Sequence, residues 1–117
     1  MFDNNNLVVA CWGHITNGFK TDKLGYLLKI NLKTKIIKKF FSTKPIGNLD
    51  GIVFDNKGGY FVTDWVKGKL FRVDDKGIAQ ELIDFQSGSA DLEFISHESL
   101  IIIPMMKDNS LLAYREE

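Results

Sequence analysis

Apolar and polar residues alternate in short runs along this chain of 117 residues, and Gly, Asn and Asp stand between the runs. Alternation with a period of two, rich in β-branched and aromatic residues, predicts β-strands with one buried face. Helical spacing is not sustained anywhere, so we expect no helix longer than one turn. The pattern predicts ten strands, at residues 7–12, 25–31, 36–42, 50–55, 59–65, 69–74, 79–85, 90–95, 100–106 and 110–116.

These strands follow an internal repeat. Residues 49–74 align with residues 90–115 without a gap, at an offset of 41. A third copy lies upstream, where Trp12 aligns with Trp65 and residues 13–24 form an insertion that we interpret as a loop. A period of about 40 residues built from short strands is typical of β-propeller blades. The sequence therefore predicts an all-β fold, a partial β-propeller of about three consecutive blades at residues 1–43, 44–85 and 86–117.

In a propeller blade of four strands, the inner strand lines the central channel and the outer strand lies farthest from it. We expect the first and last copies to be incomplete, because the first lacks an inner strand and the last lacks an outer strand. A closed ring needs roughly 4–8 blades. We therefore interpret the chain as the C-terminal half of a six-bladed propeller, with a ring of two copies as the alternative. The open apolar edge at residues 111–114 predicts self-association, since unpaired strand edges invite pairing.

Composition narrows the classes of function. Fifteen basic and fifteen acidic residues give a net charge of zero, which disfavours a nucleic-acid binder that relies on clustered Lys and Arg. No apolar run approaches the length of a membrane span, and the N-terminus lacks the pattern of a secretory signal. We expect a soluble protein without membrane association, and its compartment stays open. The single cysteine, Cys11, is expected to be a small core residue.

Three sequence words resemble the late blades of the gluconolactonase/regucalcin (senescence marker protein) family: LDGI at 49–52, YFVTDW at 60–65 and GKLFR at 68–72. The resemblance covers roughly residues 48–116. It implies a six-bladed propeller that hydrolyses lactones or related esters with a divalent cation in its central channel. By this resemblance Asp50 is a metal ligand and the catalytic base. Ca²⁺ is the expected cation, with Zn²⁺ and Mg²⁺ as alternatives.

The chain also departs from that family. Leu49 stands where the family usually has Pro, and the family's Glu-Gly-Pro and Asn-Gly-Leu elements, which supply the other ligands, have no match here. We therefore expect the isolated chain to be inactive.

The expected meander of strands brings the start of each inner strand to one end of the fold, where Asp50 and Asp91 would stand on neighbouring blades. Two carboxylates suit a hard cation such as Ca²⁺, which can polarise a carbonyl or activate water. Alternatively, each aspartate caps a turn by accepting backbone N–H groups.

The same end is expected to contain substrate contacts for a small-molecule lactone or sugar-derived ester. The candidates are His14 in the insertion, Trp65 at the end of a strand and Asn109 in a turn. The alternative for His14 is a solvated loop residue, and for Trp65 it is packing between blades. A non-catalytic propeller that serves as a ligand- or protein-binding platform is the rival function, because propellers host many activities.

Overall fold

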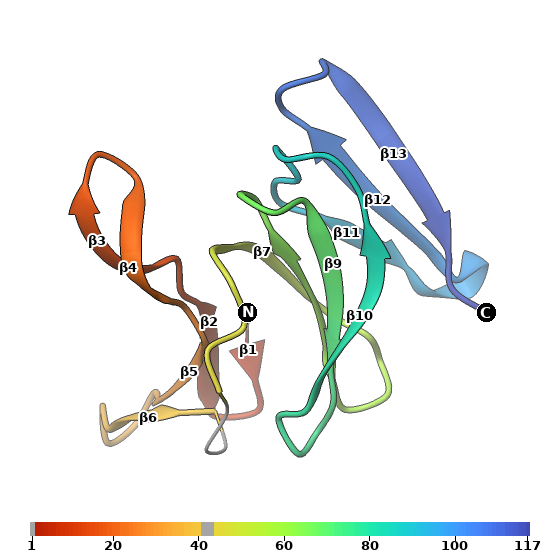
Figure 1. Ribbon diagram of the computed structural model, residues 1–117. Helices are drawn as coiled ribbons and strands as arrows, with labels where there is room; N and C mark the ends of the chain where they lie inside the picture. Colours follow the sequence, from red (N-terminus) through yellow and green to blue (C-terminus); the bar gives the residue numbers. More distant parts are fainter. Residues whose placement is uncertain (1, 41–43) are drawn as a thin grey trace.

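A computed structural model describes residues 2–40 and 44–117 of the chain, with side chains from Asn4 onward. Across these residues the protein consists of β-strands and one 3₁₀ turn, η1 (Ser96–Glu98) (Figure 1). The strands are β1 (Phe2–Asp3), β2 (Asn6–Ala10), β3 (Gly13–Asn17), β4 (Lys20–Leu24), β5 (Leu27–Asn31), β6 (Ile37–Lys39), β7 (Leu49–Phe54), β8 (Tyr60–Asp64), β9 (Lys69–Val73), β10 (Ala79–Asp84), β11 (Glu93–Ile95), β12 (Leu100–Met105) and β13 (Ser110–Arg115).

The strands form three antiparallel sheets and a separate hairpin. The first sheet has the order β1-β2-β5-β6, the middle sheet β7-β8-β9-β10 and the last sheet β11-β12-β13, while β3 pairs only with β4. The middle sheet stands between the other two, and no sheet is closed into a barrel (Figure 1). The prediction of an all-β fold without a helix longer than a turn is confirmed for the described residues.

The internal repeat is visible in the strand pairing. Phe61 lies opposite Arg72 in the middle sheet, and at an offset of 41 Ile102 lies opposite Ala113 in the last sheet. The corresponding pair in the first sheet is Val8 and Lys29. Equivalent residues of the three copies therefore occupy equivalent places in their sheets.

Two predictions about the first copy are wrong. Its inner strand is present, because the two residues of β1 pair with β2, but a strand this short leaves no periodic signal in the sequence. The insertion at residues 13–24 is a β-hairpin and not a loop. Its strands are mostly solvent-exposed on both faces, so they lack the alternation that marks a half-buried strand. The predicted strand at 36–42 is observed as Ile37–Lys39, and residues 41 and 42 lie outside the described part of the chain.

The hydrophobic core lies on both faces of the middle sheet, and every residue of β8 is buried. One cluster fills the space toward the first sheet, where Phe40 and Tyr60 pack edge to face with ring centroids 5.4 Å apart. The other cluster fills the space toward the last sheet, where Phe61 and Phe94 pack with centroids 5.0 Å apart. The three sheets are therefore held together by two layers of apolar side chains.

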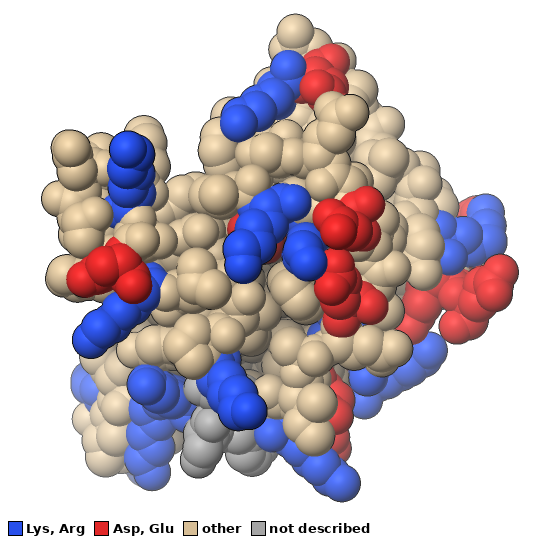
Figure 2. Space-filling view, viewed as in Figure 1, with Lys and Arg blue, Asp and Glu red and all other residues tan. Residues whose placement is uncertain are grey.

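The zero net charge conceals an uneven distribution. Residues 1–44 contain eight lysines and two aspartates, a net charge of +6, whereas residues 45–117 contain seven basic and thirteen acidic residues, a net charge of −6. Figure 2 shows many of the Lys side chains around the lower part of the first sheet and most of the acidic side chains over the other two sheets. The molecule is therefore strongly polarised along the row of sheets.

Candidate functional site

Asp50 stands in a β-bulge at the start of β7. Leu49 pairs with Asp64 and Ile52 with Val62, so Asp50 and Gly51 together oppose the single residue Thr63. A bulge adds a residue to one strand and changes the direction of its side chains, and bulges are common beside functional sites. Leu49 and Gly51 are buried, whereas the Asp50 side chain is exposed.

The hydroxyl group of Thr63 joins this bulge to the last sheet. It accepts a hydrogen bond from the Gly51 N–H at 3.0 Å and donates one to the Ala90 carbonyl at 2.8 Å. Thr63 is fully buried, so both backbone groups satisfy their hydrogen bonding away from water. Because Ala90 directly precedes Asp91, the bridge fixes the position of Asp50 relative to that of Asp91.

Gly51 allows the two segments to approach closely. A Cβ atom at this position would lie 2.7 Å from the Asp91 Cα and 2.9 Å from the Ala90 carbonyl oxygen. Both are backbone atoms, which cannot move aside as a flexible side chain would. Any residue larger than glycine would therefore push the start of the last sheet away from the bulge.

The electrostatics agree with this proximity. Partial burial first, and then the charge of Asp91, raise the pKa of Asp50 above its ordinary value of 3.8. Asp91 is exposed, and its Oδ1 accepts a hydrogen bond from the Leu92 N–H at 2.9 Å. The carboxylate of Asp50 accepts no hydrogen bond from the described residues, so the turn-cap alternative fits Asp91 but not Asp50.

The donor chemistry of this pair suits a hard divalent cation, because carboxylate oxygens are the ligands that Ca²⁺ and Mg²⁺ prefer. Ca²⁺ takes about 6–8 oxygen ligands. Within residues 2–40 and 44–117, no three His, Cys, Asp or Glu side chains are grouped so that they could hold a metal ion. Asp50 and Asp91 would supply two of these ligands.

Two of the aromatic residues at this end meet one another. The rings of Trp12 and Trp65 have centroids 6.1 Å apart, and Trp12 also contacts Phe19 at 6.3 Å. The ammonium group of Lys107 lies 4.8 Å from the centroid of the Trp65 ring. Trp65 thus contacts residues next to both neighbouring sheets. These contacts agree with the alternative interpretation of Trp65, which is packing between the repeated units.

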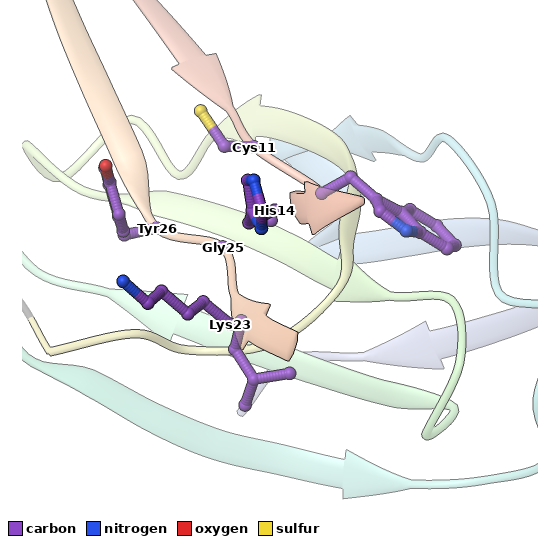
Figure 3. Close-up of a pocket in the computed structure, with 8 residues that line it drawn as sticks. Cys11, His14, Lys23, Gly25 and Tyr26 are labelled. Atoms are coloured by element: carbon purple, nitrogen blue, oxygen red, sulfur yellow. The ribbon is translucent and has the colours of Figure 1, made fainter. Parts of the chain in front are cut away.

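His14 lies in the hairpin, where its Nδ1 is 2.7 Å from the Asp22 carboxylate. It borders a hollow of about 280 Å³ between the start of the hairpin and its return to the first sheet (Figure 3). The lining residues are Cys11, Trp12, Gly13, His14, Lys23, Leu24, Gly25 and Tyr26. Burial raises the pKa of the Cys11 thiol, which disfavours the reactive thiolate.

Asn109 is exposed in the β12–β13 turn and adopts a left-handed backbone, with φ at 50°. This turn, the β8–β9 turn and the β3–β4 hairpin all lie toward the upper side of Figure 1. The structure thus places the turns that carry the predicted substrate residues on one side of the molecule. Within residues 2–40 and 44–117, no hydrogen bond or ion pair joins His14 or Asn109 to Asp50 or Asp91.

Two further residues position this end of the molecule although the sequence did not predict them, Thr63 and Asn48. The buried Asn48 amide donates to the Trp12 carbonyl and to the Thr21 hydroxyl, both at 2.9 Å, and so connects the hairpin with the start of β7. Two features of the sequence could have indicated these residues. Thr63 is a polar residue in the otherwise apolar part of β8, and Asn48 directly precedes the LDGI segment.

Comparisons with protein-family models, with curated proteins and with solved structures found no match to this chain. None of the described helical segments is long and apolar enough to cross a membrane.

Proposed function

We propose that the three sheets are consecutive blades of a partial β-propeller. Three observations support this arrangement. The chain runs through each sheet as a meander, the two faces of the middle sheet pack on its neighbours, and the copies keep the same register. In such an arrangement the starts of β7 and β11 lie beside a central channel.

At this channel we propose a divalent-cation site formed by Asp50 and Asp91. The observation that carries the proposal is the Thr63 bridge, which holds a bulged, exposed aspartate beside a second aspartate from the next sheet. Ca²⁺ fits best because both ligands are hard oxygens, whereas Zn²⁺ generally prefers nitrogen and sulfur donors. Mg²⁺ is the second choice.

The reaction that we propose for this site is hydrolysis of a lactone or a sugar-derived ester, in keeping with the resemblance of residues 48–116. When bound, the cation would polarise the ester carbonyl. Asp50 would act as the base that accepts a proton from the attacking water. His14, Trp65 and Asn109 are the proposed substrate contacts. Because two carboxylates are too few for a full ligand set, we propose that the isolated chain does not turn over substrate.

Isothermal titration with CaCl₂ tests the cation site. We expect weak binding to the wild-type chain, with a dissociation constant of about 10⁻⁴–10⁻³ M, as for extracellular calcium modules. Asp50→Asn should abolish the binding heat, and Asp91→Asn should weaken it. The control is Asp75→Asn, which changes an exposed aspartate in the β9–β10 turn. Equal binding by the Asp50→Asn variant and the wild type would remove Asp50 from the proposed site.

A non-catalytic binding platform is the second candidate, and the aromatic residues favour it. Phe19 is 80% exposed at the hairpin and contacts Trp12, which in turn contacts Trp65. Aromatic side chains with exposed surface are frequent anchors of binding sites. If this candidate is correct, Phe19→Ala should weaken binding of the small-molecule or protein ligand, whereas Asp50→Asn should leave that binding unchanged.

A further inference from the structure

The first sheet has a second face, turned away from the middle sheet, that carries mostly apolar side chains. Successive side chains of a strand point to opposite faces, and Val8 and Leu27 face the core. The apolar side chains on the opposite face are those of Ile37, which is exposed, and of Leu7, Val9, Leu28 and Ile30, which are half-buried. Lys39, which pairs with Leu28, shares this face. Strand pairing places Leu7 beside Ile30, Ile30 beside Ile37, and Val9 beside Leu28, so these five form a continuous patch. None of them belongs to either core cluster.

The last sheet has a second such face, turned away from the middle sheet. It carries Ile95, Leu100, Ile102, Pro104, Leu111 and Ala113, and pairing brings Ile95 beside Leu100, Ile102 beside Ala113, and Pro104 beside Leu111. These residues are also outside both core clusters, and Leu111 is 67% exposed. Contiguous exposed apolar surface of this kind marks interaction sites.

The internal repeat relates the residues of both outer faces to residues that are buried between sheets inside the chain. At an offset of 41, Ile102 and Leu111 correspond to Phe61 and Leu70, which are fully buried on the side of the middle sheet that faces the last sheet.

On the first sheet, at the offset of 53 that relates Trp12 to Trp65, Leu7 and Val9 correspond to Tyr60 and Val62. Those two are buried on the side of the middle sheet that faces the first sheet. The outer face of the last sheet therefore corresponds to the face of the middle sheet that packs on the last sheet. The outer face of the first sheet corresponds to the face of the middle sheet that packs on the first sheet. Packing one outer face on the other would repeat the packing between neighbouring sheets inside the chain.

Charge favours the same pairing. The first sheet lies in the part of the chain with a net charge of +6, and the last sheet lies in the part with a net charge of −6. Two first sheets, or two last sheets, would bring like charges together. Opposite potentials steer association and disfavour the like-charged alternatives.

We propose that the last sheet of one copy packs on the outer face of the first sheet of a second copy, repeating the sheet-to-sheet packing inside the chain. The interface is heterologous, because different surfaces of the two copies meet. It closes into a dimer when both ends of each copy are used. This proposal depends on the apolar faces and not on the cation site, so Asp50→Asn should leave the association unchanged.

Complementation between two variants tests the proposal. Ile37→Asp blocks the outer face of the first sheet and Leu111→Asp blocks that of the last sheet. The two positions are 61% and 67% exposed, so neither change disturbs the core. Sedimentation velocity of the wild type at about 100 µM should show a species of two chains. Each variant alone should be monomeric, whereas an equimolar mixture should form a heterodimer through its one intact junction.

The matched control is Ile78→Asp, at a 63% exposed isoleucine outside both faces, which should associate like the wild type. A second pair, Ile30→Asp and Ile102→Asp, repeats the test at the centre of each face, and circular dichroism verifies folding. Three results would overturn the proposal: a monomeric wild type, a mixture that stays monomeric, or loss of association in only one of the two variants. The last result would indicate that identical faces pair.

Discussion

Replacing Thr63 by Val is the sharpest perturbation of the connection between the middle and last sheets. The two side chains have nearly the same shape and both are β-branched, so Val favours the β-strand conformation as Thr does. The change removes the hydroxyl that accepts from Gly51 and donates to Ala90. It therefore isolates the effect of two hydrogen bonds from that of packing.

The expected loss of stability follows from the burial of these groups. Thr63 and Gly51 are buried and Ala90 is 8% exposed, so water reaches the two backbone groups poorly in the variant. An unsatisfied buried donor or acceptor costs about 1–3 kcal/mol. We expect Thr63→Val to lower the free energy of unfolding by about 2–4 kcal/mol, which is a large share of the roughly 5–15 kcal/mol that stabilises a typical domain.

Urea unfolding followed by tryptophan fluorescence measures this loss. With a slope of about 2 kcal/mol/M, the middle of the range for small proteins in urea, the midpoint should fall by about 1–2 M while the slope stays unchanged. The control is Thr16→Val, because the Thr16 hydroxyl donates to the Lys20 carbonyl in an exposed part of the hairpin. Its effect should stay within about 0.5 kcal/mol. If Thr63→Val unfolds at the same midpoint as the wild type, the hydroxyl bridge does not join the two sheets.

Further predictions concern the same region. Gly51→Ala should destabilise the protein by about 1–3 kcal/mol, since its Cβ would meet the backbone of Asp91; a stable variant with an unchanged Asp50 titration would contradict the close approach. Asn48→Ala should increase hydrogen exchange in the hairpin, because the amide that binds Trp12 and Thr21 is lost; equal protection would refute that role. The raised pKa of Asp50 means that the folded state holds this proton more tightly than the unfolded state. Its contribution to stability therefore falls as pH rises from about 3.8 through the raised folded pKa. This fall should be less than about 1 kcal/mol, because the Asp50 side chain is exposed. The Asp50→Asn variant should lack the fall, and identical pH profiles of stability for the variant and the wild type would contradict this prediction.

Much of the strand arrangement could be predicted because period-two alternation and the offset of 41 report burial directly. The ten predicted strands are all observed, within a few residues at their ends in the described part of the chain. The hairpin at residues 13–24 escaped prediction because it packs neither face on a core and is held by local contacts such as His14 with Asp22. The strand β1 escaped because two residues cannot show a period.

The candidate site could be predicted only in outline. The meander topology places Asp50 and Asp91 at the same end, and this follows from strand order alone. The bulge at Asp50 and Gly51 could not be predicted, because it depends on a hydrogen bond between Gly51 and Thr63, twelve positions away. The Thr63 bond to Ala90 spans twenty-seven positions, and no local pattern encodes a contact of that range.

The proposed cation site requires that Asp50 and Asp91 form one electrostatic unit. The most direct test is an NMR titration of the Asp50 side-chain carboxyl, with and without CaCl₂, in the wild type and in Asp91→Asn. We predict a pKa above 3.8 in the wild type, a lower pKa once the charge of Asp91 is removed, and a lower pKa in the wild type when Ca²⁺ is added, because a nearby cation favours the ionised form. An Asp50 pKa that is ordinary in the wild type and unchanged by both Asp91→Asn and Ca²⁺ would contradict the claim.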